Sequence, residues 1–482
     1  MTGDKSRSFL TQGAYQQHNL NLRYARASDE GLSVNSQLSL QAHDDPVVIA
    51  RRDKFKVLGG FFALEKPQNY RLEGGNIIPQ ASRATLTSAV LGLGGYYQLN
   101  AEGRLTRLTL IGGQVAPPLD GERFQRGVLG GTLTRIVQGD AGSLSLKGNL
   151  YRVEDLEGSI KNKLGLERLA SFLYSLGADL RSNTGLGLGS ELAFSRSDNG
   201  AVNGTSLWLG PSFQRGIFQA AANLERDSPR FINPVGSVQS DIQKADASLI
   251  LGQANQLSLN GLYTQTNVEG QSAFATKTKS AGTAVKIVPF QDLEDWKPFS
   301  VGADFRLNDS ETTGGVSKTR SQQAGLSLAY NSTGLNTTLR GEYLPQSDRL
   351  NAANDLKTYR ATWQTGFKLV NPYGVTLAPF WNVTLERRKS LSSNLTSPSE
   401  SVGAGVNATY SDWLTLGARH DFQHQLSRPG DRRVTNNATQ VGAKFLVKTK
   451  APIILGLNYY YKNYHDTALN DFAERNCAPR LM

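Results

Sequence analysis

Hydrophobic and polar residues alternate with a period of two along most of the chain. Between Tyr359 and Leu369 the odd positions are Tyr, Ala, Trp, Thr, Phe and Leu, while the even positions are Arg, Thr, Gln, Gly and Lys. After Asn371 and Pro372 the same alternation resumes and continues to Glu386. Successive side chains of a strand point to opposite faces, so this pattern predicts a hairpin with one apolar face and one largely polar face.

The same alternation recurs throughout the chain, and its connections alternate between tight turns and longer polar loops. Helical spacing does not fit these windows. Each tight turn joins two strands, so the turns predict about 24 strands, within a range of roughly 22 to 26. The predicted tight turns lie near residues 28–30, 67–68, 100–102, 139–140, 183–184, 215–216, 253–255, 292–295, 332–334, 371–372, 411–412 and 450–451.

Short turns at one rim and long loops at the other are typical of outer-membrane barrels, whose periplasmic turns are tight. The pattern therefore predicts an all-β fold, a single closed antiparallel up-and-down transmembrane barrel over residues 13–464. We expect an N-terminal periplasmic segment over residues 1–12 and a C-terminal tail over residues 465–482. No stretch approaches the roughly 18 uninterrupted apolar residues that a membrane-spanning helix needs.

In this pattern the chain resembles the large outer-membrane barrels of Gram-negative bacteria, a class that includes porins, fimbrial ushers, siderophore receptors and polymer exporters. The resemblance covers residues 13–464 and singles out no one family. It implies an integral location in the bacterial outer membrane, contact with outer-membrane lipid and lipopolysaccharide, and insertion by the barrel-assembly machinery.

The two ends of the chain depart from this resemblance. The segment from Met1 to Leu10 lacks the apolar core of a secretory signal, which an exported protein needs, so we interpret the sequence as mature or truncated. Such barrels commonly end on a strand with a terminal aromatic residue, whereas here a polar tail with the only cysteine, Cys477, follows the last predicted strand. We expect either a periplasmic tail or a natural chain that ends elsewhere.

Aromatic residues near the tight turns support a membrane location. Amphipathic rings prefer the level of the lipid headgroups, so they predict one aromatic girdle, although aromatic residues also favour strands in general. The residues concerned are Tyr70, Trp296, Tyr330, Tyr373, Tyr410 and Trp413.

The formal net charge is +11, from 52 Lys and Arg against 41 Asp and Glu. If the apolar faces meet lipid, the polar faces line a lumen whose predicted cations outnumber its acids, which favours anionic solutes. The excess could instead pair with lipopolysaccharide phosphates, loop acids or an absent plug, and no nucleic-acid partner is expected. The predicted pore-lining residues are Arg23, Lys54, Lys56, Lys147, Arg306, Arg340, Arg360, Lys368, Arg419, Lys444 and Lys448, with the acids Asp179, Glu191, Asp304, Glu342, Glu386 and Asp421.

The strand number sets the width of the predicted lumen. Strands about 4.8 Å apart and tilted by about 40° give a backbone cylinder of about 48 Å diameter for 24 strands. Side chains cannot fill that width, so the lumen is open, lined by folded-in loops, or occupied by a plug or a periplasmic partner. No segment is long enough for an independent plug domain, and the loops are too short to close the lumen fully.

Candidate chemistry in the sequence is weak. His420 and His424 are four residues apart, which on a strand corresponds to about 13 Å, so joint metal binding is not expected. The glycines over residues 185–189 superficially resemble a dinucleotide loop but lack the following helix. We therefore expect no catalytic residues, no metal, no cofactor and no enzymatic activity.

Four functional hypotheses follow from these patterns. The leading one is an outer-membrane pore for passive diffusion, or an export conduit for a polymer or a protein. The alternatives are a structural or adhesive barrel, and an usher-like or receptor-like barrel filled by a partner. A soluble β-rich enzyme such as a propeller or solenoid remains as a competitor, because a period near 40 residues can also arise from propeller blades.

Overall fold

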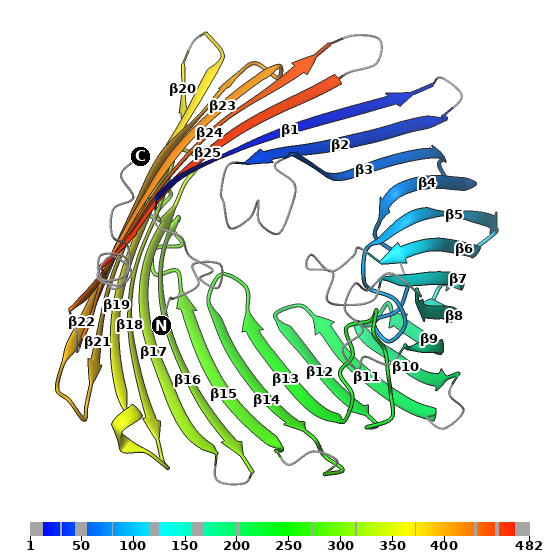
Figure 1. Ribbon diagram of the computed structural model, residues 1–482, viewed down its shortest axis with the longest axis horizontal. Helices are drawn as coiled ribbons and strands as arrows, with labels where there is room; N and C mark the ends of the chain where they lie inside the picture. Colours follow the sequence, from blue (N-terminus) through cyan, green and yellow to red (C-terminus); the bar gives the residue numbers. More distant parts are fainter. Residues whose placement is uncertain are drawn as a thin grey trace, which may run out of the picture.

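The structure is a computed structural model in which one antiparallel sheet closes on itself to form a barrel (Figure 1). The first strand, β1 (Gly13–Ala27), pairs with β2 (Ser33–His43) on one side and with the last strand, β25 (Ile453–Asp466), on the other. The described residues are 13–28, 31–43, 55–79, 81–115, 125–156, 168–198, 203–270, 274–313, 316–371, 373–428, 431–448 and 453–467.

The sheet contains 25 strand segments that make 24 crossings of the wall. The extra segment is β20 (Leu369–Val370), which pairs with β21 (Val375–Ser390) and continues β19 (Leu356–Phe367) beyond an interruption at Lys368. The predicted fold class and strand number are therefore confirmed. The propeller and solenoid hypothesis is wrong, because a single closed sheet replaces separate blades or coils.

The remaining strands follow one another around the barrel in chain order. They are β3 (Phe55–Lys66), β4 (Tyr70–Ile77), β5 (Val90–Ala101), β6 (Arg104–Val115), β7 (Arg126–Gly139), β8 (Gly142–Asp155), β9 (Ala170–Ser182), β10 (Leu186–Ser197), β11 (Asn203–Arg215), β12 (Phe218–Asp227), β13 (Ile242–Gly252), β14 (Gln256–Thr266), β15 (Thr276–Ile287), β16 (Phe299–Thr312), β17 (Ser317–Asn331), β18 (Leu335–Asp348), β22 (Thr396–Tyr410), β23 (Leu414–Ser427) and β24 (Arg432–Val447). A short 3₁₀ helix, η2 (Ala352–Asn354), lies between β18 and β19.

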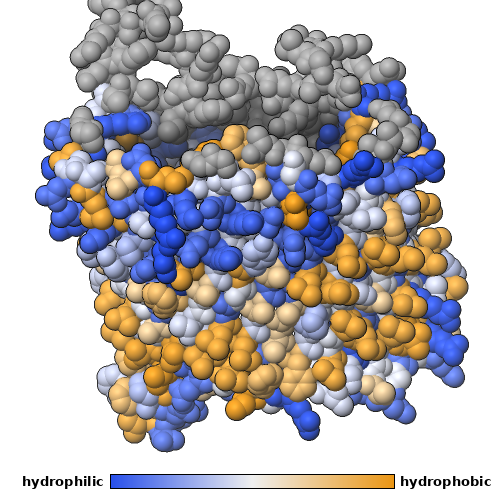
Figure 2. All heavy atoms as spheres, turned by 90° about the horizontal axis from the view of Figure 1, so that it is seen from below, coloured by the Kyte–Doolittle hydropathy of each residue, from blue (hydrophilic) through white to orange (hydrophobic). Residues whose placement is uncertain are grey.

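The outer wall of the barrel is apolar. The side chains of Leu93, Leu129 and Leu176 are 74%, 69% and 71% exposed, although they are leucines in the middle of regular strands. Figure 2 shows apolar side chains gathered in a band across the outer surface. A closed barrel pairs every strand with two neighbours, which leaves no open edge in a medium without water. An apolar outer wall of this kind is therefore the wall that meets lipid.

Within the described residues, short connections occupy one rim of the barrel at the predicted positions, except that the connection over residues 288–298 is longer than a turn. The predicted turn over residues 450–451 lies outside the described residues. Glycine supplies the left-handed backbone in several of the short connections, as at Gly103 (φ 65°) and Gly216 (φ 57°). The predicted girdle aromatics lie at this rim, where Tyr373 is 82% exposed and Trp413 stacks edge-on against Tyr410 at 5.7 Å between centroids.

The opposite rim carries the long connections and also the start of β1 and the end of β25. Gly13 pairs with Tyr464 at this rim. The tight turns therefore lie at one rim, and the first and last strand residues of the barrel lie at the other. The predicted periplasmic segment, residues 1–12, and the tail beyond Thr467 lie outside the described residues. Among the described helical residues, none forms a helix long and apolar enough to cross a membrane.

Candidate pore and its inner wall

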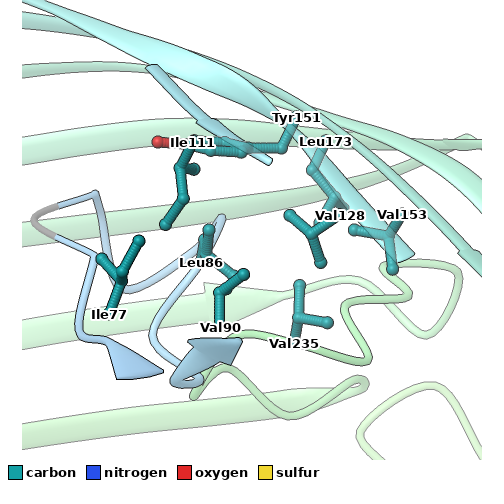
Figure 3. Close-up of a cluster of buried hydrophobic side chains, with 9 residues drawn as sticks. All are labelled: Ile77, Leu86, Val90, Ile111, Val128, Tyr151, Val153, Leu173 and Val235. Carbon is teal, nitrogen blue, oxygen red and sulfur yellow. The ribbon is translucent and has the colours of Figure 1, made fainter. Parts of the chain in front are cut away.

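Two connections fold into the barrel and pack against its inner wall (Figure 1). We name them the first inner loop, residues 81–89, and the second inner loop, residues 228–241. Leu86 and Val235 from these loops are fully buried against wall residues that alternate with exposed outward leucines, such as Ile111 and Leu173 (Figure 3). The lumen is thus lined on this side by folded-in loops, one of the three arrangements expected from the sequence.

Hydrogen bonds join the two inner loops to each other. The Nδ2 of Asn233 donates to the carbonyl of Ala84 at 2.6 Å. The amides of Thr87 and Ser88 both donate to the carbonyl of Val235 at 3.0 Å. These contacts connect segments about 150 residues apart in the sequence, so the two loops form one structural unit.

The same unit is anchored to the wall. Arg83 of the first inner loop forms an ion pair with Glu225 of β12, and its guanidinium lies 5.7 Å from the ring centre of Trp208. Arg126 of β7 donates to the carbonyl of Pro234 at 3.2 Å. Anchors on β7, β11 and β12 hold the inner loops over one side of the lumen.

A chain of ion pairs crosses the inner wall from β16 to β21. Arg340 contacts Asp304 at 2.8 Å and Glu342 at 3.0 Å, and Arg360 contacts Glu342 at 3.4 Å and Glu386 at 2.6 Å. We call these five residues, together with Arg388, which contacts Glu386 at 2.6 Å, the charge ladder. Because each acid of the ladder lies within contact distance of an arginine, the predicted cations Arg340 and Arg360 contribute little net field to the lumen.

Four other predicted pore-lining cations differ from the ladder arginines in their surroundings. Among the described residues, no carboxylate lies within ion-pair distance of Arg23, Lys147, Arg306 or Lys444. By the alternation of the strands these four share the inward face with the charge ladder. Any excess positive potential in the described part of the lumen comes mainly from such cations, since their charges are not locally compensated.

The other predicted residues are distributed over the wall and the tight-turn rim. Arg419 is paired with Asp421 at 2.7 Å, while Asp179 and Glu191 line a hollow beside Lys147. Lys368 interrupts β19 and β20, and Lys448 follows β24, so both lie at the tight-turn rim instead of the spanning wall. Lys54 lies outside the described residues, and the side chain of Lys56 is not described.

Sequence reasoning missed the inner loops and the ladder residue Arg388. Apolar residues within otherwise polar connections, such as Leu86, Phe231 and Val235, are the signal that could have found the loops, since an exposed loop has no need of them. Among the described residues, no group of three or more His, Cys, Asp or Glu side chains could hold a metal ion.

Comparisons with known proteins give fold likeness alone. No family model matches the chain, and no curated protein matches it. The solved structures that are similar include the siderophore receptor PirA from Pseudomonas aeruginosa, with a TM-score of 0.42, 10% identity, and 95% of this chain and 81% of that chain covered. The P pilus usher PapC translocation pore gives a TM-score of 0.40, 12% identity, and coverage of 93% and 99%.

The class of the protein rests on its own architecture. A closed 24-strand barrel with an apolar outer wall and a polar inner wall is a large transmembrane barrel of the outer-membrane class. This confirms the predicted class and the predicted location as an integral outer-membrane protein.

Proposed function

We propose that the protein is an outer-membrane conduit for hydrophilic solutes, working by passive diffusion or by export of a polymer or protein, with a lumen that modestly favours anions. The observation that carries the proposal is the polar inner wall opposite the inner loops. There a hollow of about 440 Å³ is lined by ladder residues together with Ser, Thr and Gln side chains from β19, β21, β22 and β23. A hydrogen-bonding wall of this kind is what a water-filled passage needs.

The position of the inner loops favours a passage that is narrower than the barrel. They pack against wall strands between β4 and β12 and occupy part of the lumen there, leaving hollows of about 550 Å³ and 560 Å³ beside them. Hollows of about 440 Å³ and 520 Å³ lie against the wall from β18 through the closure to β2, where neither inner loop packs. The proposed passage runs along this second side. We attribute the anion preference to the cations Arg23, Arg306 and Lys444, since the charge ladder is internally compensated.

A second candidate is a structural, adhesive or partner-filled barrel without an open channel, as in an usher-like or receptor-like protein. It is favoured by the tight anchoring of the inner loops, which shows that part of the lumen is occupied by the chain itself. A periplasmic or plug partner would occupy the rest. In both candidates we expect surrounding lipid and lipopolysaccharide, insertion by the barrel-assembly machinery, and no enzymatic activity.

Swelling of proteoliposomes in neutral sugars of graded size separates the two candidates. Folded barrel, identified by its altered gel mobility without heating, should admit small sugars and exclude larger ones. Vesicles that contain heat-modifiable barrel yet take up no sugar of any size would contradict the conduit and favour the partner-filled barrel.

A further inference from the structure

A hollow of about 520 Å³ lies in the inner wall where the last strands of the barrel meet the first ones. It is built by β21 to β25 on one side of the closure and by β1 and β2 on the other. Its polar lining is dominated by carboxamide side chains, which each offer both donors and acceptors. These amides are Asn21, Gln37, Asn407, Gln440 and Asn458.

Glycines give this hollow its depth. An added Cβ at Gly442 would lie 2.7 Å from the Oδ1 of Asn458, and one at Gly417 would lie 2.9 Å from the Oδ1 of Asn407. A side chain at either position would force the amide beside it to shift. Both amides therefore lie close over the neighbouring strand and border the hollow.

One aromatic ring lies in this polar surface. Phe380 of β21 points inward, and an added Cβ at Gly405 would lie 2.6 Å from the Cζ of its ring. The guanidinium of Arg419 lies 6.0 Å from the ring centre. An aromatic face beside several amides is the combination that binds a sugar ring, since the ring packs on its C–H face while the amides bond its hydroxyls.

Two cations complete the lining. Arg23 and Lys444 both border the hollow, and among the described residues neither has a carboxylate within ion-pair distance. Arg419, by contrast, is already held by Asp421 at 2.7 Å and 2.8 Å. Arg23 and Lys444 are thus available for an anionic group of a ligand, and arginine matches the geometry of a carboxylate.

We propose that this hollow is a binding subsite for an acidic saccharide, a sugar unit that carries a carboxylate, within a chain that moves along the inner wall. Phe380 packs against the sugar ring, and the amides form hydrogen bonds with its hydroxyls. Arg23 and Lys444 bind the carboxylate. The proposal deepens the conduit function and rests on it only for the entry of the chain, because the binding itself requires no transport.

The test measures binding to folded full-length barrel in detergent by titration calorimetry, with three probes. Hexagalacturonate carries sugar rings and carboxylates, maltohexaose carries rings alone, and inorganic phosphate carries charge alone. Hexagalacturonate should bind about tenfold more tightly than either of the others, because it alone uses both kinds of contact. Equal binding of phosphate would reduce the hollow to a simple anion site, and equal binding of maltohexaose would remove the role of the cations; either result overturns the proposal.

Variants locate the binding at the hollow. Lys444→Gln and the double variant R23Q/K444Q should weaken hexagalacturonate binding about tenfold while leaving maltohexaose unchanged. Phe380→Leu should weaken binding of both saccharides about fivefold. The matched control is Lys147→Gln on β8, another inward cation that borders a different hollow, and it should bind like the unaltered protein. Unchanged binding by Lys444→Gln and Phe380→Leu, each verified as heat-modifiable, would overturn the assignment.

Conduit and subsite can fail separately. A barrel that binds hexagalacturonate but passes no solute in the swelling experiment would retain the subsite and lose the conduit. A barrel that passes small sugars but binds the three probes equally would retain the conduit and lose the subsite.

Discussion

The side chain of Asn233 bonds the carbonyl of Ala84 at 2.6 Å across a sequence separation of 149 residues. Its Oδ1 also accepts from the amides of Val235 at 3.1 Å and Gly236 at 2.8 Å. One carboxamide therefore shapes the second inner loop and ties it to the first. In the proposed conduit, where the two inner loops narrow the lumen, this contact therefore contributes to the width of the passage.

Asn233→Ala should loosen the inner loops and enlarge the passage. The substitution removes three hydrogen bonds and leaves backbone groups without these partners, at a cost of about 1–3 kcal/mol to loop docking. We expect a higher and noisier single-channel conductance with unchanged heat-modifiability. Asn255→Ala is the control, since Asn255 accepts from the Val288 amide at the tight-turn rim, at the opposite end of β13 from the second inner loop. Equal effects of the two substitutions would argue against a constricting role.

Leu86→Ala should destabilise the docking of the first inner loop. Leu86 is fully buried in the cluster with Val90, Val128 and Val235, so truncation removes apolar contacts and leaves a cavity. Comparable core substitutions cost about 2–5 kcal/mol. Limited proteolysis of folded protein should cut within residues 81–89 in the variant and spare the unaltered chain. Leu93→Ala, at a 74% exposed outward leucine, should leave the protease pattern unchanged.

Most of the barrel could be predicted from the sequence because its signals are local. Strand alternation repeats every two residues, and turn residues lie between the strands they join, so the positions of the short connections and the strand number follow without tertiary information. The inner loops could not be found this way. Their burial depends on contacts such as Leu86 with Val235. The sequence around either residue does not indicate that the two residues pack together.

For the charged residues too, the local sequence predicts the face of the strand but not the partners. Alternation placed Arg340, Arg360 and Glu386 on the polar face, but their mutual pairing depends on the register of neighbouring strands, as in Arg360 opposite Glu386. A count of charges therefore does not tell which cations of the wall are locally compensated. Arg23 and Lys444 come together only because the first and last strands close the barrel.

Glu386→Gln should make the pore more selective for anions. The substitution removes the carboxylate that Arg360 and Arg388 share, so Arg388 loses its carboxylate partner and Arg360 keeps only Glu342, at 3.4 Å. The reversal potential in a salt gradient should move toward that of the anion, whereas Arg360→Gln should move it toward that of the cation. Shifts of the same sign in both variants, or no shift in either, would contradict a passage along the charge ladder.

The tight-turn rim should show a modest acid sensitivity through Asp412. The Lys448 ammonium lies 2.6 Å from the Asp412 carboxylate, and this hydrogen bond, with the backbone and Ser411, lowers the pKa of Asp412 below its usual value of 3.8. Because the folded pKa is depressed, the stabilising contribution is present above the unfolded pKa and is lost as the pH falls through the folded pKa. Asp412→Asn should lower the unfolding temperature slightly at pH 7 and leave it unchanged near pH 2. An equal effect at both values would exclude the ion pair as the cause.

The orientation of the barrel can be read from surface labelling. External loops of outer-membrane barrels are the longer ones, so we expect the connection over residues 349–355 to face outward and the turn over residues 332–334 to face the periplasm. A peptide tag inserted between Asn351 and Ala352 should bind antibody on intact cells, and one inserted at Thr333 should bind only after permeabilisation. The reverse result would place the tight turns at the cell surface.

The most direct test of the conduit is single-channel conductance of heat-modifiable barrel in planar bilayers, with a salt gradient to read selectivity. We predict discrete, long-lived openings with a weak preference for anions, which Lys444→Gln reduces. A folded barrel that inserts, as verified by protease protection in vesicles, yet carries no current would contradict an open conduit.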